Sequence, residues 1–391
     1  MSMTAFGGAA LFVGFLVLAA ATPQQVSWAT DLHVKGVVDV AGPRSDGKLL
    51  VSGGDRLYLL DRATRRLEPF AGGPGGYPGG KGDEPYLTVA AGERVEASGC
   101  SFQPDEAYVL QQGSHEVLRI DVGGLAHPFA QVDGVESLNG IAFDTVGRFG
   151  HRLLVVGPSH GLTVVAAIDC RGGVEHLTDF APAMEGGMAV APPGFGAFGG
   201  DLIVPDELAG VIRAVRPDGS TAVVAESGLP AGGDIGVEGV GFVPSGFREG
   251  GTAYFADRAT PGNPHPGTDT LLNLDAQRLV GAGVQEGDLL AATEGGALAI
   301  AVRCAASCRT FRVATGPAPA HGEGHLLVVA DHGPSRAASL PEASDLGVSA
   351  RREALLVRAA AVGLVAVALL LAAGLGLLLY RRRRRRGQGE G

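Results

Sequence analysis

A short motif that recurs along the chain constrains the fold more than any other feature. It consists of an acidic, amide or hydroxyl residue, a glycine, and an apolar run that often ends at Pro or Asp. It occupies residues 98–104, 139–144, 185–192 and 238–244, with a looser copy from residue 294. The glycines at 99, 140, 186, 239 and 295 follow one another at intervals of 41 to 56 residues. Self-similarity at this spacing is typical of a chain built from repeated structural units.

Further short apolar runs follow these copies. Residues 152–156, 201–205 and 253–256 are predicted second strands, and residues 210–219 a third strand. The third strand leads over Asp218-Gly219 into residues 221–225, and Asp-Gly between two apolar runs is a hairpin signal. With a first unit at 48–70 and a closing segment at 326–331, the pattern predicts an all-β, six-bladed β-propeller. Five or seven blades, or a pair of β-sandwiches, are the alternatives.

The strand heads at Asn139-Gly140 and Glu238-Gly239 resemble those of a large propeller superfamily. It comprises the six-bladed gluconolactonase, senescence-marker, paraoxonase, strictosidine-synthase and NHL-repeat propellers. The resemblance covers residues 40–335 as a pattern and concerns the architecture, not one activity. In lactonases of this superfamily, polar residues at the strand heads bind the metal ion that activates the substrate.

The resemblance therefore makes Asn139, Glu185 and Glu238 candidate metal ligands. Asp206 and Asp257, each just after a predicted second strand, are further candidates. Oxygen ligands of this kind suit a hard cation, and Ca²⁺ is the expected ion. The alternative is that the Glu-Gly and Asn-Gly pairs serve turns, because these residues favour left-handed backbone and local hydrogen bonds. No residue matches the superfamily's general-base aspartate, so catalysis stays open.

Three other segments match, in part, motifs that bind metals, carry a catalytic serine or line ligand pockets. The motif His321-Gly-Glu-Gly-His325 offers at most half of a transition-metal site, and we expect it to lie on the surface. Residues 157–161 fit Gly-x-Ser-x-Gly, but no helical pattern follows them, so a turn is expected. The Pro-rich residues 258–269 are predicted to form a wall of the ligand pocket.

The two ends of the chain predict export and membrane anchoring. Residues 359–380 contain only Ala, Val, Leu, Gly and a final Tyr, and a helix of that length spans about 33 Å. Six arginines follow at 381–386, which places the C-terminus in the cytoplasm. A buried core helix beside a basic tail is the alternative. Residues 1–21 are predicted to be a signal peptide, although no Lys or Arg precedes the apolar run, so an uncleaved anchor remains an alternative.

The predicted organisation is a signal peptide (1–21), a propeller ectodomain (22–333), a stalk (334–358), a transmembrane helix (359–380) and an Arg-rich tail (381–391). The chain has a net charge of −10, but nine arginines and two glutamates lie from residue 350 onward, which leaves −17 before it. Such an acidic domain suits cations or cationic partners and excludes nucleic acid. The expected partners are the bilayer, through the helix, and a ligand or protein that the sequence does not identify.

Four cysteines, in a compartment where disulfides persist, favour two disulfides. Three pairings are possible, and we favour Cys304–Cys308 with Cys100–Cys170.

Two functional hypotheses follow. The first is a membrane-anchored propeller that binds a ligand or protein partner without catalysis. The alternative is a calcium-dependent, lactonase- or esterase-like hydrolase with its site at the central channel.

Overall fold

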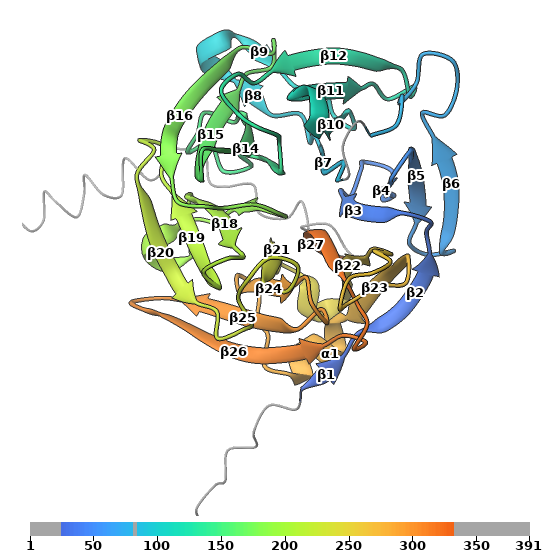
Figure 1. Cartoon of the computed structure of the whole chain (residues 1–391), viewed down its shortest axis with the longest axis vertical. Coiled ribbons are helices and arrows are strands. Elements are labelled where there is room, and N and C mark those ends of the chain that lie inside the picture. Colours follow the sequence, from blue (N-terminus) through green and yellow to red (C-terminus); the bar gives the residue numbers. More distant parts are fainter. Residues whose placement is uncertain (1–24, 81–83, 332–391) are drawn as a thin grey trace, which may run out of the picture. The chain divides into compact units, whose positions relative to one another are not determined.

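The computed structural model describes residues 25–80 and 84–331, which form an all-β propeller of six blades around a central channel (Figure 1). In Figure 1, β3, β7, β21 and β27 lie around the centre, and β6, β12, β16, β20 and β26 lie at the rim. The predicted signal peptide, stalk, transmembrane helix and arginine tail fall outside the described residues. Within residues 25–80 and 84–331, no helix is long and apolar enough to cross a membrane.

Four blades are continuous in sequence, and each runs from an inner to an outer strand through antiparallel pairs. Blade A contains β3 (Val37–Ala41), β4 (Leu49–Gly53), β5 (Arg56–Asp61) and β6 (Arg66–Phe70). Blade B contains β7 (Leu87–Val89), β10 (Ala107–Gln111), β11 (Glu116–Ile120) and β12 (Ala126–Gln131). Blade C contains β13 (Gly140–Phe143), β14 (Leu153–Ser159), β15 (Leu162–Ile168) and β16 (Val174–Ala181). Blade D contains β17 (Ala189–Val190), β18 (Leu202–Asp206), β19 (Val211–Val215) and β20 (Thr221–Glu226).

The last two blades are interleaved in sequence. Blade E contains β21 (Val237–Phe242), β24 (Leu289–Thr293), β25 (Ala299–Cys304) and β26 (Cys308–Thr315), with β1 (Val26–Ser27) parallel to β26. Blade F contains β27 (Gly322–Ala330), β22 (Gly251–Asp257), β23 (Thr270–Asp275) and β2 (Ala29–His33). After β21 the chain crosses to blade F for β22 and β23, and it returns through α1 (Ala276–Gly281) to β24.

This crossing corrects one prediction. Residues 253–256 are not the second strand of the unit that begins at Glu238, because β22 pairs with β23 and β27 in the neighbouring sheet. The second strand of that unit is β24, which pairs with β21. Residues 152–156 and 201–205 lie largely in second strands, as expected. Of residues 157–161, the first three end β14 and pair with β15, and only His160 and Gly161 form the predicted turn.

A second prediction is also wrong. The motif copy at 98–104 does not begin the inner strand of a blade. It lies in a small hairpin of β8 (Arg94–Val95), η1 (Glu96–Ser98) and β9 (Cys100–Ser101), while β7 supplies the inner strand of blade B. A disulfide from Cys100 to Cys170 ties this hairpin to the turn after β15. The second disulfide, Cys304–Cys308, closes the turn between β25 and β26. Both pairs are the ones favoured from the sequence.

Where the motif begins or precedes an inner strand, the narrowness of the channel explains its glycines. A Cβ at Gly239 would lie 2.3 Å from the backbone oxygen of Gly324, and a Cβ at Gly187 would lie equally close to the same atom. Gly187 and Gly239 form a parallel bridge between blades D and E. The amide of Gly187 donates to the carbonyl of Glu238 at 2.9 Å. Inner strands therefore approach one another so closely that only glycine leaves room.

A buried ion pair crosses the channel. His325 of β27 places Nδ1 2.9 Å from Oδ2 of Asp39 in β3, and its Nε2 lies 2.8 Å from the carbonyl oxygen of Ile141. Asp39 also accepts the backbone N–H of Leu87 at 2.8 Å. Burial alone lowers the pKa of His325, but Asp39 reverses this and raises it, which favours the imidazolium. The pair links blades F, A, B and C. The expectation that His325 lies on the surface is therefore wrong.

Candidate functional site

A cluster of acidic side chains lies where the inner strands begin. Since these strands run through the channel in one direction, the residues at and just before their starts meet at one mouth. We call this cluster the acidic chamber and define it by Glu84, Tyr86, Asn139, Glu185, Glu207, Glu238, Arg258, Glu294, His321 and Glu323. These residues belong to blades B to F or to the segments that lead into them.

The structure brings three of the predicted ligands together. The Nδ2 of Asn139 donates to Oε2 of Glu185 at 3.0 Å. A Cβ on Gly186, the next residue, would lie 2.7 Å from Oε1 of Glu238. That same Oε1 accepts the hydroxyl of Tyr86 at 2.7 Å. Side chains from four blades thus converge on one volume.

The other two predicted ligands have protein partners for both carboxylate oxygens. Asp206 accepts the backbone N–H of Ala209 at 2.9 Å and pairs with Arg213 at 2.6 Å. Asp257 accepts the backbone N–H of His321 at 2.8 Å and the hydroxyl of Thr268 at 2.5 Å. Asp206 therefore stabilises a hairpin, and Asp257 positions the start of β27.

A second group within the chamber includes His321 and Glu323, which the sequence placed in a surface motif, and Glu294, which no sequence signal connected with them. The Nε2 of His321 lies 2.8 Å from Oε1 of Glu294 and 3.4 Å from Oε1 of Glu323. One potential ligand atom from each of these three residues lies within 4.8 Å of the others. His321 is 2% exposed, so the expectation of a surface position is wrong for this histidine also. The cause is topological, because the His-Gly-Glu-Gly segment opens the innermost strand of blade F.

The guanidinium of Arg258 already places a positive charge on one side of the chamber. The Nη1 of Arg258 lies 3.2 Å from Oε1 of Glu84 and 3.1 Å from Oε1 of Glu323. Tyr86 reaches the same glutamate, with its hydroxyl 3.1 Å from Oε2 of Glu323. Arg258 begins the segment 258–269, so this segment contributes one of the residues that define the chamber. That the segment forms a wall of a ligand pocket stays a prediction.

The charges of the chamber do not balance. Among its defining residues, six carboxylates face one guanidinium and one imidazole. Burial, together with the neighbouring carboxylates, raises the pKa of Glu84, Glu185 and Glu207 to about 7 each. Burial and the nearby Glu323 raise the pKa of Glu238 well above its usual value. Burial lowers the pKa of His321, but hydrogen bonds to Glu294 and Glu323 outweigh it and raise it to about 10.

Two oxygens of the chamber lack any partner among the residues that the structure describes. They are Oδ1 of Asn139 and Oε1 of Glu207, and both are buried. The two residues are 7% and 6% exposed, so solvent does not compensate them. A buried polar atom without a partner is costly, and bound cations would satisfy such oxygens while they offset the excess negative charge. The donor set therefore fits a divalent cation held by oxygen atoms.

The opposite mouth of the channel has a different character. A cavity of about 450 Å³ lies there, and its walls include the last residues of inner strands, such as Ala41, Phe143, Val190 and Phe242. His325 contributes to its lining, so the buried ion pair with Asp39 separates this apolar cavity from the acidic chamber.

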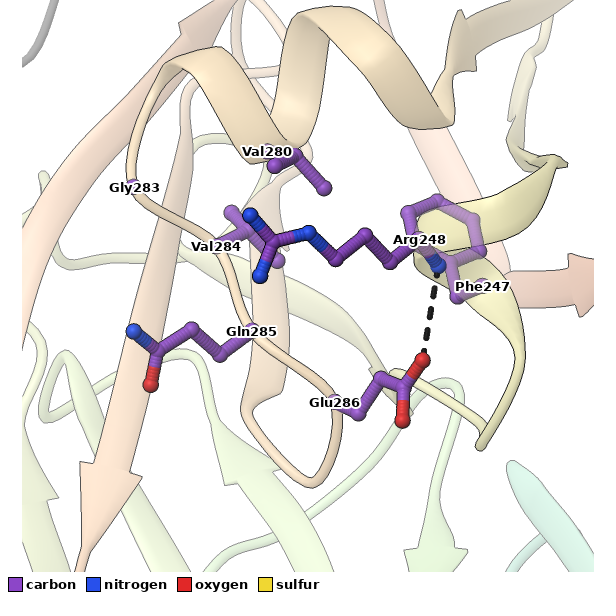
Figure 2. A pocket seen from close by; sticks show the side chains of 7 residues that line it. All are labelled: Phe247, Arg248, Val280, Gly283, Val284, Gln285 and Glu286. Carbon is purple, nitrogen blue, oxygen red and sulfur yellow. Dashed lines mark hydrogen bonds between the residues drawn. The ribbon is translucent and has the colours of Figure 1, made fainter.

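A separate hollow of about 400 Å³ lies beside α1 and η4 (Phe247–Glu249). Figure 2 shows the side chain of Arg248 extending past Val280 and Val284, while the backbone N–H of Arg248 donates to Glu286. None of the residues that define the acidic chamber lines this hollow. Two loops and a helix line this hollow, and none of its lining residues belongs to a cluster of potential metal ligands among the described residues.

Neither a protein-family model nor a curated protein sequence matches the chain. Among solved structures, the chain is similar to a calcium-binding protein, regucalcin, from Agrobacterium tumefaciens, with a TM-score of 0.44 and 11% identity over 77% of this chain and 82% of that one. It is also similar to virginiamycin B lyase from Staphylococcus aureus, with a TM-score of 0.41 and 9% identity over 72% of each chain. The calcium of the one and the lyase activity of the other are properties of those proteins, and likenesses this distant carry no residue roles across.

Proposed function

We propose that this protein is a membrane-anchored, extracytoplasmic propeller that binds a cationic ligand through the acidic chamber, and that Ca²⁺ is the first such ligand. The observation that carries the proposal is the excess of carboxylates in the chamber, beside the buried Oδ1 of Asn139, which has no partner in the described part of the chain. Protons or cations must offset such a concentration of negative charge, because ionised carboxylates at close range destabilise one another.

The oxygen atoms on blades C to E suit calcium. Asn139, Glu185 and Glu238 together offer amide and carboxylate oxygens from three blades. Ca²⁺ accepts six to eight oxygen ligands in flexible geometry, so a chamber assembled from separate strands can hold it.

Calcium titration of the full chain, purified in detergent after chelation, tests the proposal. We expect one high-affinity site by calorimetry and a rise in the unfolding temperature with Ca²⁺, because a ligand that binds only the folded state stabilises it. Glu185→Gln removes one negative charge and replaces one carboxylate oxygen by an NH2 group at similar size, and it should weaken calcium binding at least about tenfold.

The matched control is Glu226→Gln, a change of the same kind on the exposed outer strand of blade D. It should leave calcium affinity unchanged. Equal loss in both variants, or no calcium-dependent shift in the wild type, would contradict a site in the chamber.

The proposed orientation in the membrane needs a separate test. In intact cells, an amine-reactive reagent that does not cross membranes should label exposed lysines of the propeller such as Lys35. A tag placed after residue 391 should react with antibody only after permeabilisation. Labelling of the tag before permeabilisation would show that the C-terminus lies outside the cell and would contradict the proposed orientation.

A hydrolase is the second candidate, and one observation favours it. Glu185 and Glu207 interact directly, and each has a pKa raised to about 7, so either can exchange a proton near neutral pH. A calcium-dependent lactonase or esterase would need such a group beside its metal. Hydrolysis of simple lactones and aryl esters by the wild type, abolished in Glu207→Gln and retained in Glu226→Gln, would support this activity. An inactive wild type would leave ligand binding as the function.

A further inference from the structure

Blades E and F contribute a chemically different part of the chamber. Glu294 follows β24, and His321 and Glu323 open β27, so residues far apart in sequence meet across the two interleaved blades. All three are at least nine-tenths buried, at 8%, 2% and 3% exposure. Unlike the oxygen atoms on blades C and D, this group offers an imidazole nitrogen, Nε2, that faces both carboxylates.

The spacing of these atoms suits a small ion. Ligand atoms about 2.1 Å from a tetrahedral Zn²⁺ are roughly 3.4 Å apart. The Nε2 of His321 and Oε1 of Glu323 are 3.4 Å apart, and the 2.8 Å separation from Glu294 needs to open only slightly. Ca²⁺ prefers an all-oxygen set with longer bonds, whereas an imidazole with carboxylates suits transition-metal ions.

A further buried oxygen lies next to this group. Glu207 is close enough to Glu294 for a hydrogen bond between their side chains. Its Oε1 is buried and has no partner within the described part of the chain. Two carboxylates at this range require a proton or a metal ion between them, so the free oxygen points independently to a ligand at the edge of the three-residue group.

We propose that Glu294, His321 and Glu323 form a second cation position, which takes a divalent transition-metal ion such as Zn²⁺, with Glu207 as an additional oxygen ligand. Asp257 is a positioning residue for this site, because it accepts the backbone N–H of His321. Arg258 contacts the same oxygen of Glu323, Oε1, as His321 does, and Tyr86 donates to Oε2, so both residues position this carboxylate. The site is independent of the calcium position and can exist without it.

Co²⁺ and Zn²⁺ titrations of the chelator-treated full chain test this site. Co²⁺ ligated by nitrogen and oxygen gives visible absorption bands, and all four cysteines are in disulfides, so no thiolate contributes. We expect one Co²⁺ per chain, displaced by equimolar Zn²⁺. His321→Gln and Glu294→Gln should each weaken Zn²⁺ binding at least about tenfold. His160→Gln, on a side chain that is 96% exposed, should not.

Competition on the wild type keeps the test decisive if a variant fails to fold. Excess Ca²⁺ should leave the Co²⁺ spectrum in place, because the two ions occupy different positions. Stoichiometric displacement of Co²⁺ by Ca²⁺, or wild-type Zn²⁺ affinity in a folded His321→Gln protein, would overturn the proposal. Calcium binding that fails while Co²⁺ binds would contradict only the calcium site, so the two proposals fail separately.

Discussion

At the scale of single residues, glycines decide how close the inner strands come. Gly239 faces the backbone of Gly324, and the gap between them has no room for a methyl group. The residue before it, Glu238, reaches the chamber because its backbone is held at this short distance. Glycine at the strand head is therefore part of the geometry of the site as well as of the fold.

Gly239→Ala should destabilise the protein by at least about 2 kcal/mol, because the added Cβ would lie 2.3 Å from a backbone oxygen that can move only with β27. Urea unfolding, followed through the single, buried Trp28, measures this loss. The control is Gly233→Ala, where a Cβ meets nothing within 4 Å and the change should stay within about 0.5 kcal/mol. Equal midpoints for the two variants would show that the strands separate more easily than we infer.

At the scale of elements, the two disulfides constrain very different lengths of chain. Cys100–Cys170 joins a hairpin inserted in blade B to the turn after β15 of blade C, with a sequence separation of 70. Cys304–Cys308 closes a turn within one blade, with a separation of 4. The entropy that a cross-link removes from the unfolded chain grows with the loop it closes.

The double variant Cys100→Ser with Cys170→Ser should therefore lose about 4 kcal/mol of stability. The double variant Cys304→Ser with Cys308→Ser should lose about 2 kcal/mol. Urea midpoints under non-reducing conditions give both values. A larger loss from the small loop would contradict the entropic account for this protein.

At the scale of the whole molecule, the chamber couples stability to pH. Glu84, Glu185 and Glu207 have a native pKa of about 7, above the ordinary value of 4.5, so the native state binds more protons than the unfolded state between these pH values. Stability contributed by such groups is present at low pH and is lost as the pH rises through the native pKa. His321, raised to about 10, contributes in the same direction at higher pH.

In chelator, the unfolding temperature should fall between pH 5 and pH 7.5, because each unit of raised pKa corresponds to about 1.4 kcal/mol of stability lost on ionisation. Calcium should remove most of this fall, since the ion stabilises the ionised carboxylates. Differential scanning calorimetry at several pH values, with and without Ca²⁺, measures both effects. A flat or rising unfolding temperature in chelator would mean that the chamber is neutralised in some other way.

Much of the architecture was predictable because local signals and packing agree. The apolar runs at 152–156 and 201–205 are bounded by turn residues, and they form the expected strands. The Asp218-Gly219 turn joins β19 to β20, as predicted. The crossing of the chain between blades E and F was not predictable. The sequence of β22 is equally compatible with pairing to β21 of blade E or to β27 of blade F. Only the pairing with β23 and β27 distinguishes them.

The candidate site was partly predictable for a similar reason. Asn139, Glu185 and Glu238 precede or begin inner strands with a glycine beside them, so the repeat marks them. Glu207 has no such signal, since it lies after a second strand and reaches the chamber from a turn. His321 and Glu323 look like a flexible Gly-rich loop until their strand is known to be the innermost one of its blade.

The interleaving of blades E and F also limits how a gene for such a protein can change. The segments that encode blades A to D are contiguous, so one of them can be duplicated or deleted as a unit. A copy of the segment for blade E would carry β22 and β23 of its neighbour with it, and that neighbour also needs β2 from the start of the chain. Variation in blade number among descendants of this gene should therefore arise between residues 37 and 226, and the last two blades should be inherited together.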